Sequence, residues 1–465
     1  MTETVWTALA GLDLTIRHVR VGEWNTRVLE AGTGRETLVL MHGTGGHLET
    51  YARNIAAFAG HYRVIAFDFP GHGYSTLTER DLEFDAYRTH LLGLLDTLGI
   101  ERAHLNGESL GGAVAVKFAA AHPNRIGKLV LNTPGGLPAR PEVLGRLRTL
   151  SQQAADDPSF ERVRSRLEWL MADPASVTDE LVAIRLPIYA QHGFARSMRH
   201  ILCLQDPEIR TRNLITDTEL SAIGAPTLVI WTSDNPSGPA DAGRELASKL
   251  YAGRFELIDG AGHWPQWEQP DGFHDVVLKF LAEPTPPLEI EFLPPAASRD
   301  HATVGLLTEL INQVYEESER GLWVAGGTRT TPAELAGMIR ARTIAVARLA
   351  GHVVGCVRVQ RLESGEGECG LLAADPRRRG IGIGRELLRF AEEACRRDGL
   401  TTMQLELLVP RNWTHPSKEF LASWYVRCGY RQVRTGLLED DYPALAPLLA
   451  TPCDFAIYHK DLTAN

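Results

Sequence analysis

Apolar residues in the first part of the chain gather in short continuous runs, and the segments between these runs show helical spacing. Continuous runs at 37–41, 62–67, 102–106, 128–132, 226–231 and 255–258 predict strands, most of them covered on both faces. Helical patterns occupy 85–98, 111–121, 241–251 and 272–281. Because strands and helices alternate, we expect an α/β fold: a parallel sheet with helices on both faces and ligands at the carboxyl ends of its strands.

Two stretches depart from this alternation. Residues 12–33 alternate between apolar and polar positions, which predicts an opening hairpin. Residues from about 138 to 217 are helical in pattern, rich in charge and free of strand-like runs. A helical insertion after a strand of such a sheet predicts a cap over the functional site.

A proline-rich segment separates the two halves of the chain. Residues 283–296 contain five prolines, which indicates a stiff linker with a first strand at 288–293. We therefore expect domains at 1–284 and 285–465. In the second half we expect helices at 302–316, 332–340, 385–397 and 417–428, and strands at 343–348, 353–360, 368–374, 402–409 and 454–460. This order predicts a smaller α+β unit.

Composition narrows the class of protein. The 465 residues, 44% hydrophobic and 23% charged, indicate a soluble globular chain of two or three domains. A formal net charge of −10 argues against nucleic acid as the main partner. The six cysteines form no C-x-x-C pair, so we expect reduced thiols, no metal site and a cytoplasmic protein. No signal peptide or membrane-spanning run is visible, and a homodimer is left open.

A serine turn is the first candidate for chemistry. Gly107-Glu-Ser109-Leu-Gly111 lies between a predicted strand and a predicted helix, where a sharp turn would expose the serine oxygen as a nucleophile. His263, in a glycine-rich turn after the last strand, is the candidate base. The backbone N–H groups of Leu110 and of Thr44, in His42-Gly-Thr-Gly, would form an oxyanion hole.

These motifs carry a family resemblance. With Asp68-Phe-Pro-Gly-His-Gly-Tyr-Ser75 between them, they occur in the order of the α/β-hydrolase family, which residues 1–283 resemble. The run His263-Trp-Pro-Gln-Trp-Glu268 is similar to the meta-cleavage-product hydrolases, which split carbon–carbon bonds in dienoate ketones. The resemblance implies a serine hydrolase acting on an ester, amide or C–C (ketone) bond of a small acid or ketone beneath a helical cap.

One position departs from the family pattern. The family carries its third catalytic residue, an acid, where this chain has Asn235, and the nearest acid is Asp234. Three interpretations follow: Asn235 orients His263 through its amide oxygen, a re-formed turn brings Asp234 to the histidine, or the domain binds without turnover. An Asp-to-Asn change costs ~10⁴ in rate in a serine protease, so the choice matters. The cap also carries candidates for a carboxylate clamp: Arg196, Arg199, Arg210 and Arg212.

The second half contains a glycine-rich anion cradle. Arg379-Gly380-Ile-Gly382-Ile-Gly384 precedes a helix, so successive N–H groups and the helix N-terminus can converge on a pyrophosphate. The glycine spacing and the neighbouring antiparallel pattern favour coenzyme A over a dinucleotide. The segment resembles the GNAT acetyltransferases over about 288–462, which implies acetyl-CoA or another acyl-CoA held by Arg379, Gly380, Gly382 and Gly384.

Further roles follow from the same resemblance. In Trp424-Tyr425-Val-Arg-Cys-Gly-Tyr430, Tyr425 would protonate the leaving thiolate, and Glu368 would be the general base for the amine. The backbone from Leu372 to Ala374 would pair with the pantetheine arm. We therefore expect a bifunctional enzyme, a serine-type hydrolase joined to an N-acyltransferase. The alternative is an acetyltransferase with a non-catalytic hydrolase-like domain that binds small molecules.

Overall fold

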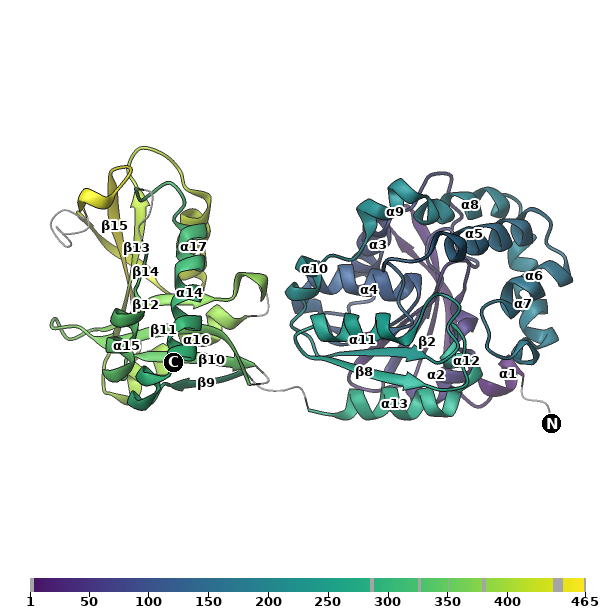
Figure 1. The fold of residues 1–465 in the computed structure, drawn as a ribbon, viewed down its shortest axis with the longest axis horizontal. Coiled ribbons are helices and arrows are strands. Elements are labelled where there is room, and N and C mark those ends of the chain that lie inside the picture. The colour runs from purple at the N-terminus through teal and green to yellow at the C-terminus, as the bar shows by residue number, and fades with distance from the viewer. Residues whose placement is uncertain are drawn as a thin grey trace. The chain divides into compact units, whose positions relative to one another are not determined.

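The computed structural model describes residues 4–284, 288–324, 328–349, 351–378, 382–437 and 446–463 (Figure 1). The chain divides into two compact units, Met1–Thr285 and Pro286–Asn465. Each unit has its own sheet and its own hydrophobic core. Among the described residues, no helix has the length and apolar character needed to cross a lipid bilayer.

An eight-stranded sheet forms the centre of the first unit, in the order β1-β2-β4-β3-β5-β6-β7-β8. Its strands are β1 (Leu14–Val21), β2 (Trp24–Ala31), β3 (Thr37–Met41), β4 (Arg63–Phe67), β5 (Ala103–Glu108), β6 (Ile126–Asn132), β7 (Thr227–Thr232) and β8 (Gly253–Ile258). From β3 to β8 all neighbouring strands run parallel, whereas β1 and β2 form the antiparallel opening hairpin. The predicted α/β class is confirmed.

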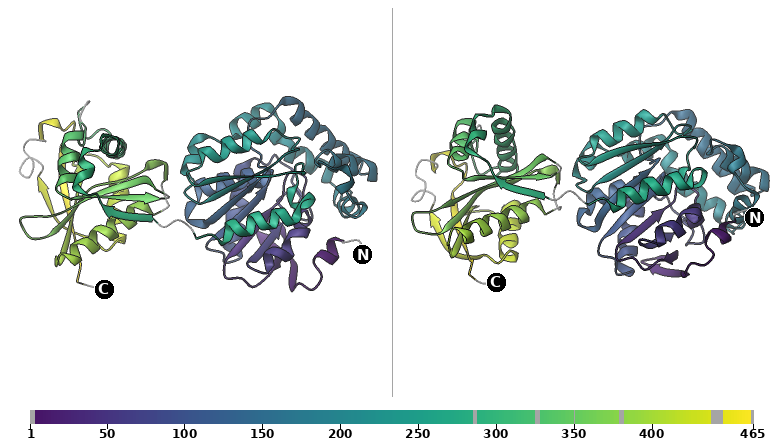
Figure 2. Two further views of the ribbon diagram at one scale, coloured as in Figure 1. Left: turned by 60° about the horizontal axis from the view of Figure 1, so that its bottom comes forward. Right: turned by 90° about the horizontal axis from the view of Figure 1, so that it is seen from below.

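Helices cover both faces of this sheet (Figure 2). They are α2 (Ala52–Ala59), α3 (Phe84–Thr97), α4 (Leu110–Ala121), α11 (Ala240–Lys249) and α13 (Pro270–Ala282), with short helices α1 (Val5–Ala8) and α12 (Pro265–Glu268). Helix α2 packs with α13, and α3 packs with α4 on the opposite face. Strand β3 is buried along its whole length, which is why its sequence is a continuous apolar run without alternation.

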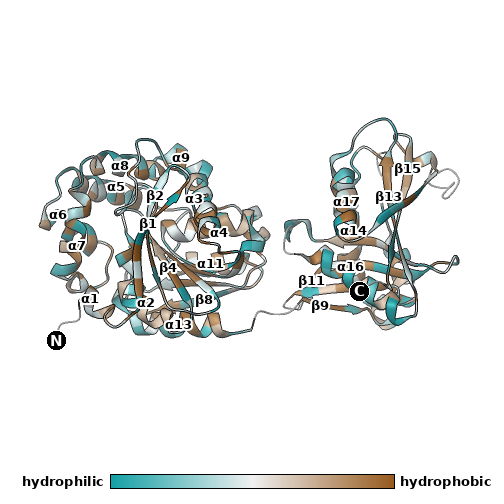
Figure 3. Cartoon of the chain, turned by 180° about the vertical axis from the view of Figure 1, so that it is seen from behind, coloured by the Kyte–Doolittle hydropathy of each residue, from teal (hydrophilic) through white to brown (hydrophobic). Residues whose placement is uncertain are grey.

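The segment between β6 and β7 is helical throughout its regular elements. It contains α5 (Pro141–Asp156), α6 (Phe160–Glu168), α7 (Asp179–Tyr189), α8 (Phe194–Ile201), α9 (Pro207–Asn213) and α10 (Asp217–Ala222). These helices are amphipathic: Val163, Leu181 and Met198 are fully buried, and polar residues lie on the outer faces (Figure 3). Their apolar faces join the core of the first unit and complete a roof beside the carboxyl ends of the strands.

The second unit is built on a seven-stranded sheet in the order β14-β15-β13-β12-β11-β10-β9. The strands are β9 (Leu288–Phe292), β10 (Ile344–Leu349), β11 (His352–Arg361), β12 (Gly367–Ala374), β13 (Thr402–Pro410), β14 (Arg431–Leu437) and β15 (Cys453–Asp461). Its helices are α14 (His301–Ser318), α15 (Pro332–Arg340), α16 (Ile383–Arg397) and α17 (Pro416–Arg427). The sequence did not predict β14, because six of its seven residues are exposed and no apolar pattern marks it.

Candidate active site

Ser109 lies on a strained turn between β5 and α4. Its backbone has φ of +51° and ψ of −110°, a conformation that L residues adopt rarely. The flanking glycines are required by close packing: a Cβ at Gly107 would lie 2.3 Å from the Gly111 carbonyl oxygen, and one at Gly111 would lie 2.4 Å from that of Met41. The Gly-x-Ser-x-Gly spacing therefore exists because only glycine fits on either side of the serine.

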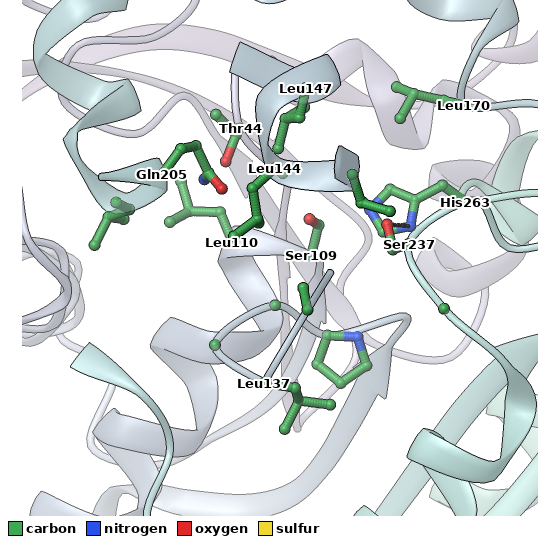
Figure 4. A pocket seen from close by; sticks show the side chains of 18 of the residues that line it. Thr44, Ser109, Leu110, Leu137, Leu144, Leu147, Leu170, Gln205, Ser237 and His263 are labelled. Atoms are coloured by element: carbon green, nitrogen blue, oxygen red, sulfur yellow. Dashed lines mark hydrogen bonds between the residues drawn. The ribbon is translucent and has the colours of Figure 1, made fainter. Parts of the chain in front are cut away.

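Two backbone amides are available beside the serine. Thr44 follows β3 and Leu110 is the first residue of α4, and both line the cavity that contains Ser109 (Figure 4). Neither amide donates to an acceptor among the described residues. The Thr44 loop is held by His42, whose Nε2 accepts the Phe69 N–H at 3.1 Å and whose Nδ1 lies 2.8 Å from the Gly43 carbonyl. The arrangement suits an oxyanion.

His263 is oriented by Asn235. Its Nδ1 lies 3.0 Å from Asn235 Oδ1, with Ser237 Oγ also at 3.3 Å. The Ser237 backbone N–H donates to the same Asn235 oxygen at 3.0 Å, so that atom must be the amide oxygen and an acceptor. Nδ1 of His263 therefore carries the proton, and Nε2 presents its lone pair to the cavity.

Asp234 does not contact the histidine. It is exposed, and its carboxylate accepts a hydrogen bond from Ser233 Oγ at 2.6 Å. Of the two adjacent candidates, the structure brings Asn235 to His263 and leaves Asp234 outside, because β7 ends in a turn that buries the asparagine. In the described part of the chain no hydrogen bond joins Ser109 Oγ to His263, although both line the cavity.

Glu108 is a buried acid that the sequence analysis did not single out. Its side chain is 1% exposed, and its carboxyl group accepts hydrogen bonds from the Gly43 backbone and the Trp264 side chain. Oε1 lies 3.4 Å from Nε2 of His263. Burial raises the pKa of Glu108 to about 8, while burial and then the Arg166 charge lower the pKa of His263 to about 4. Glu108 occupies the variable position of the serine motif, so the motif carried no signal for it.

Two buried arginines lie close to this acid. Arg166 on α6 is 1% exposed and donates to Ser151 Oγ and the Thr44 carbonyl, at 3.0 Å and 2.7 Å, but its Nη1 has no partner among the described residues. Arg185 on α7 is fully buried and has a hydrogen bond with Tyr189, but no carboxylate pairs with it among the described residues. Its guanidinium carbon lies 5.2 Å from the centre of the Trp264 ring. Unpaired buried cations are costly and point to an anionic ligand.

The arginines expected to clamp a carboxylate have other partners. Arg196, Arg199 and Arg212 form ion pairs with Glu79, Asp156 and Glu83. All three pairs are largely exposed, so they leave the cavity without these cations. Arg210 does line the cavity and donates to the Leu137 carbonyl. The buried cations of the cap are instead Arg166 and Arg185. The spacing of charged residues along the sequence does not single them out.

The cavity has a volume of about 190 Å³. Helix α5 of the cap contributes an apolar wall of Val143, Leu144 and Leu147; Leu144 and Leu147 are labelled in Figure 4. On the sheet side Glu108, Ser109 and His263 line the cavity, and Arg166 from α6 adds a cation to the lining. One face therefore suits an apolar group and the other a reacting polar group.

In the second unit the sheet opens between β12 and β13. These strands run parallel and pair at Gly367 with Met403 and at Glu368 with Gln404, but not beyond. The backbone from Leu372 to Ala374 therefore has no β13 partner and can pair with an extended ligand. Gly382 has φ of +89° and caps α16, which Gly384 enters. Arg379 and Gly380 lie outside the described residues.

Tyr425 and Glu368 come from different elements. Tyr425 on α17 is 7% exposed, and its ring centre lies 5.8 Å from that of Tyr458 on β15. Burial raises the pKa of Tyr425 well above its ordinary value, which keeps its hydroxyl protonated. The carboxylate of Glu368 accepts a hydrogen bond from Gln360 Nε2 on the neighbouring strand β11. An acyl-CoA fits the described residues, since the open strand edge and the α16 N-terminus are both present.

The sheet order, the serine turn and the helical cap define an α/β hydrolase. Residues 38–276 match the family model described as "Alpha/beta hydrolase family", and residues 340–432 match "Acetyltransferase (GNAT) domain". The chain belongs to the alpha/beta hydrolase family, and its second half contains a GNAT acetyltransferase domain. Both predicted resemblances are confirmed.

The relatives of the hydrolase half are named as hydrolases of unsaturated oxo acids. The chain is 37% identical over 300 residues to the 2-hydroxy-6-oxononadienedioate/2-hydroxy-6-oxononatrienedioate hydrolase of Paraburkholderia phymatum, covering 61% of this chain and 100% of the relative. It is 36% identical over 269 residues to the 2-hydroxy-6-oxo-6-phenylhexa-2,4-dienoate hydrolase of Comamonas testosteroni, covering 55% and 90%. The hydrolase domain is thus similar to C–C hydrolases of meta-cleavage pathways.

Solved structures share the fold. A 2-hydroxy-6-oxo-6-phenylhexa-2,4-dienoate hydrolase from Rhodococcus superposes with a TM-score of 0.53 at 24% identity, covering 58% of this chain and 100% of that one. A meta-cleavage product hydrolase from Pseudomonas fluorescens gives a TM-score of 0.50 at 27% identity, covering 57% and 96%. These likenesses show the fold of the first unit, and the two family matches indicate enzymatic activity in both halves.

Proposed function

We propose that the first unit is a serine hydrolase that cleaves a carbon–carbon bond in a small carboxylated ketone. The observation that supports this most is the common cavity of Ser109, His263 and the free amides of Thr44 and Leu110. Ser109 attacks the carbonyl carbon, His263 Nε2 accepts its proton, and the two amides stabilise the oxyanion. Asn235 holds the histidine in the required tautomer without adding charge.

The substrate class follows from the walls of the cavity. The carboxylate of an acid substrate would neutralise the unpaired Nη1 of Arg166, with the charge of Arg185 behind it. The apolar wall from α5 would hold the opposite end of the molecule. Esters and amides of similar shape remain within reach of the same chemistry. The relatives act on dienoate ketones, which combine these two features.

Two assays test this proposal. One sample of wild-type protein is labelled with a fluorophosphonate probe, and a separate unlabelled sample is given 2-hydroxy-6-oxo-6-phenylhexa-2,4-dienoate and p-nitrophenyl acetate. Labelling that disappears in Ser109→Ala, together with turnover of the dienoate, is the expected result. If wild type and Ser109→Ala have equal rates on both substrates, the domain binds without turnover. Asn235 supplies no negative charge to His263. This favours a second candidate function, in which the domain is a small-molecule sensor for the transferase.

For the second unit we propose N-acyl transfer from acetyl-CoA to a small amine. Bound acyl-CoA would supply the thioester, its pantetheine arm along Leu372 to Ala374 and its pyrophosphate at Arg379, Gly380, Gly382 and Gly384. Tyr425 would return a proton to the departing thiolate, and Glu368 would remove one from the amine. Glu363, Glu366 and Glu368 lie close together in sequence and support a cationic acceptor.

Calorimetric titration of the full chain with acetyl-CoA and with NADH tests the ligand class. Binding of acetyl-CoA without binding of NADH is expected, and the reverse would contradict the proposal. The six cysteines are free, and reduced thiols agree with a cytoplasmic location. None of them belongs to a proposed site. That location, like the homodimer, stays a prediction.

A further inference from the structure

In the hydrolase site the carboxyl group of Glu108 lies beside Nε2 of His263, whereas the acid of a serine-protease triad lies beside Nδ1. Nδ1 of His263 faces the neutral amide of Asn235, whereas Nε2 lies 3.4 Å from Oε1 of Glu108. The Glu108 side chain is the last of β5 and directly precedes Ser109, so the turn that exposes the nucleophile also positions the acid. Glu108 lines the cavity, where it can touch a bound substrate.

Glu108 is tightly enclosed. A Cβ at Gly43 would lie 2.4 Å from Oε2 and 2.7 Å from Oε1, so the carboxyl group rests directly against the Gly43 backbone. Its hydrogen-bond donors are the neutral Gly43 backbone and Trp264 side chain, and among the described residues only His263 lies within ion-pair distance of it. A buried acid without an arginine or lysine partner is costly to keep unless it has a task.

We infer that Glu108 is a catalytic acid: it donates its proton to the leaving group and then, as a carboxylate, stabilises the imidazolium of His263. This inference rests on the proposed hydrolase function. Glu108 then provides the negative charge that Asn235 lacks, and this charge lies beside Nε2 of His263 instead of Nδ1.

The proton balance closes over one turnover. Ser109 Oγ attacks the carbonyl carbon as its proton passes to His263 Nε2. The bond to the leaving group breaks, its electron pair stays with that group, and the Glu108 proton goes to it. The resulting imidazolium and carboxylate are neighbours, and transfer from Nε2 to Oε1 restores a neutral pair. His263 then takes a proton from water as the water oxygen attacks the acyl-serine, and returns it to Ser109 Oγ as the acid product leaves.

The resting state of the pair agrees with this sequence. The groups that face Glu108 are Arg166 from α6, Arg185 from α7, Tyr51 from the segment after β3, and His263. Burial raises the pKa of Glu108 to about 8 and outweighs the Gly43 hydrogen bond, the two arginine charges and the Trp264 hydrogen bond, which all lower it. Since the pKa of His263 is lowered to about 4, the proton of the pair resides on Glu108 at pH 7.

The test compares leaving groups in Glu108→Gln, which preserves shape but cannot donate an acid proton. A p-nitrophenolate leaves as a stable anion and needs no acid, whereas an ethoxide or a carbanion does. We expect kcat for ethyl butyrate and for the dienoate to fall about 10²-fold or more, and kcat for p-nitrophenyl butyrate to fall less than about 10-fold. Equal losses on all substrates, with an unchanged melting temperature, would indicate a positioning role and overturn the inference; so would no loss on any.

The design separates this inference from the proposed function. A wild type that hydrolyses esters but not the dienoate contradicts the carbon–carbon specificity alone, and the ethyl and p-nitrophenyl esters still decide the role of Glu108. A wild type that turns over no substrate overturns both. Fluorophosphonate labelling of Glu108→Gln checks that Ser109 remains exposed, because p-nitrophenol release and labelling both require the intact turn.

Discussion

Asn235 Oδ1 lies 3.0 Å from Nδ1 of His263, and the Ser237 backbone N–H donates to the same oxygen. This contact fixes which nitrogen of His263 carries the proton. The amide selects the tautomer in which Nε2 is free, which is the task that an acid performs at this position in other serine hydrolases. It adds no negative charge, so the stabilisation of a histidine cation must come from elsewhere in the site.

Asn235→Asp is expected to raise kcat for p-nitrophenyl acetate, by about 10-fold. The gain is smaller than the ~10⁴ loss known for an Asp-to-Asn change, because the Ser237 N–H already fixes the tautomer here. Stopped-flow measurement of p-nitrophenol release at pH 7 checks it. A rate equal to or below that of wild type would show that charge at Nδ1 does not limit this enzyme.

Asp234→Asn is expected to change kcat and KM less than about 2-fold, since an exposed group away from the reacting atoms contributes little. The Asp234 carboxylate is exposed and hydrogen-bonded to Ser233. The same ester assay measures it. A loss of two orders of magnitude would instead mean that the turn after β7 rearranges on substrate binding and brings Asp234 to His263.

The pH profile of kcat/KM for ethyl butyrate is expected to be bell-shaped. Activity rises as the pH increases through about 4, because His263 must be neutral to accept a proton. It falls as the pH increases through about 8, because Glu108 must be protonated to donate one. The descending limb disappears in Glu108→Gln. If that limb stays at the same pH in the variant, another group is responsible for it.

Arg166→Gln is expected to raise KM for the carboxylated dienoate more than about 10-fold, and KM for neutral p-nitrophenyl acetate less than about 3-fold. Loss of a buried charged hydrogen bond to a carboxylate accounts for the difference. Arg196→Gln is the matched control, since Arg196 lies on the exposed surface of the cap and pairs with the exposed Glu79. Equal changes in KM for both substrates would place the carboxylate elsewhere.

Gly382→Ala is expected to weaken acetyl-CoA binding about 10-fold in calorimetry. A Cβ at φ of +89° strains the cap of α16, and relief of that strain would shift the amides of its first turn. Gly399→Ala is the matched control: it has φ of +77°, likewise has open space around it, and lies at the other end of the same helix. Both variants carry similar strain, so a weaker affinity in Gly382→Ala but not in Gly399→Ala assigns the effect to the cradle.

The strands of the first sheet were predictable because their environment is uniform. Residues 37–41 and 128–132 are buried on both faces. Because both faces need apolar side chains, such a strand has a continuous apolar run in its sequence. Strand β14 was not predictable, since its exposed residues carry no such pattern. The strand β5 also extends to Glu108, two residues beyond the apolar run, because backbone pairing with β6 continues where the side chains turn polar.

The sequence by itself determined both families and the location of Ser109, His263 and the glycine cradle, because turns that need glycine or a fixed strand order leave spacings that can be recognised locally. Only the tertiary structure decided that Asn235 and not Asp234 meets the histidine, that Glu108 and Arg166 lie near it, and that Arg185 lies near Glu108. Those relationships join segments far apart in the chain, and they depend on where a turn directs a side chain and on what excludes water around it. Neither the direction of a side chain nor its burial in such a site leaves a recognisable pattern in the neighbouring sequence.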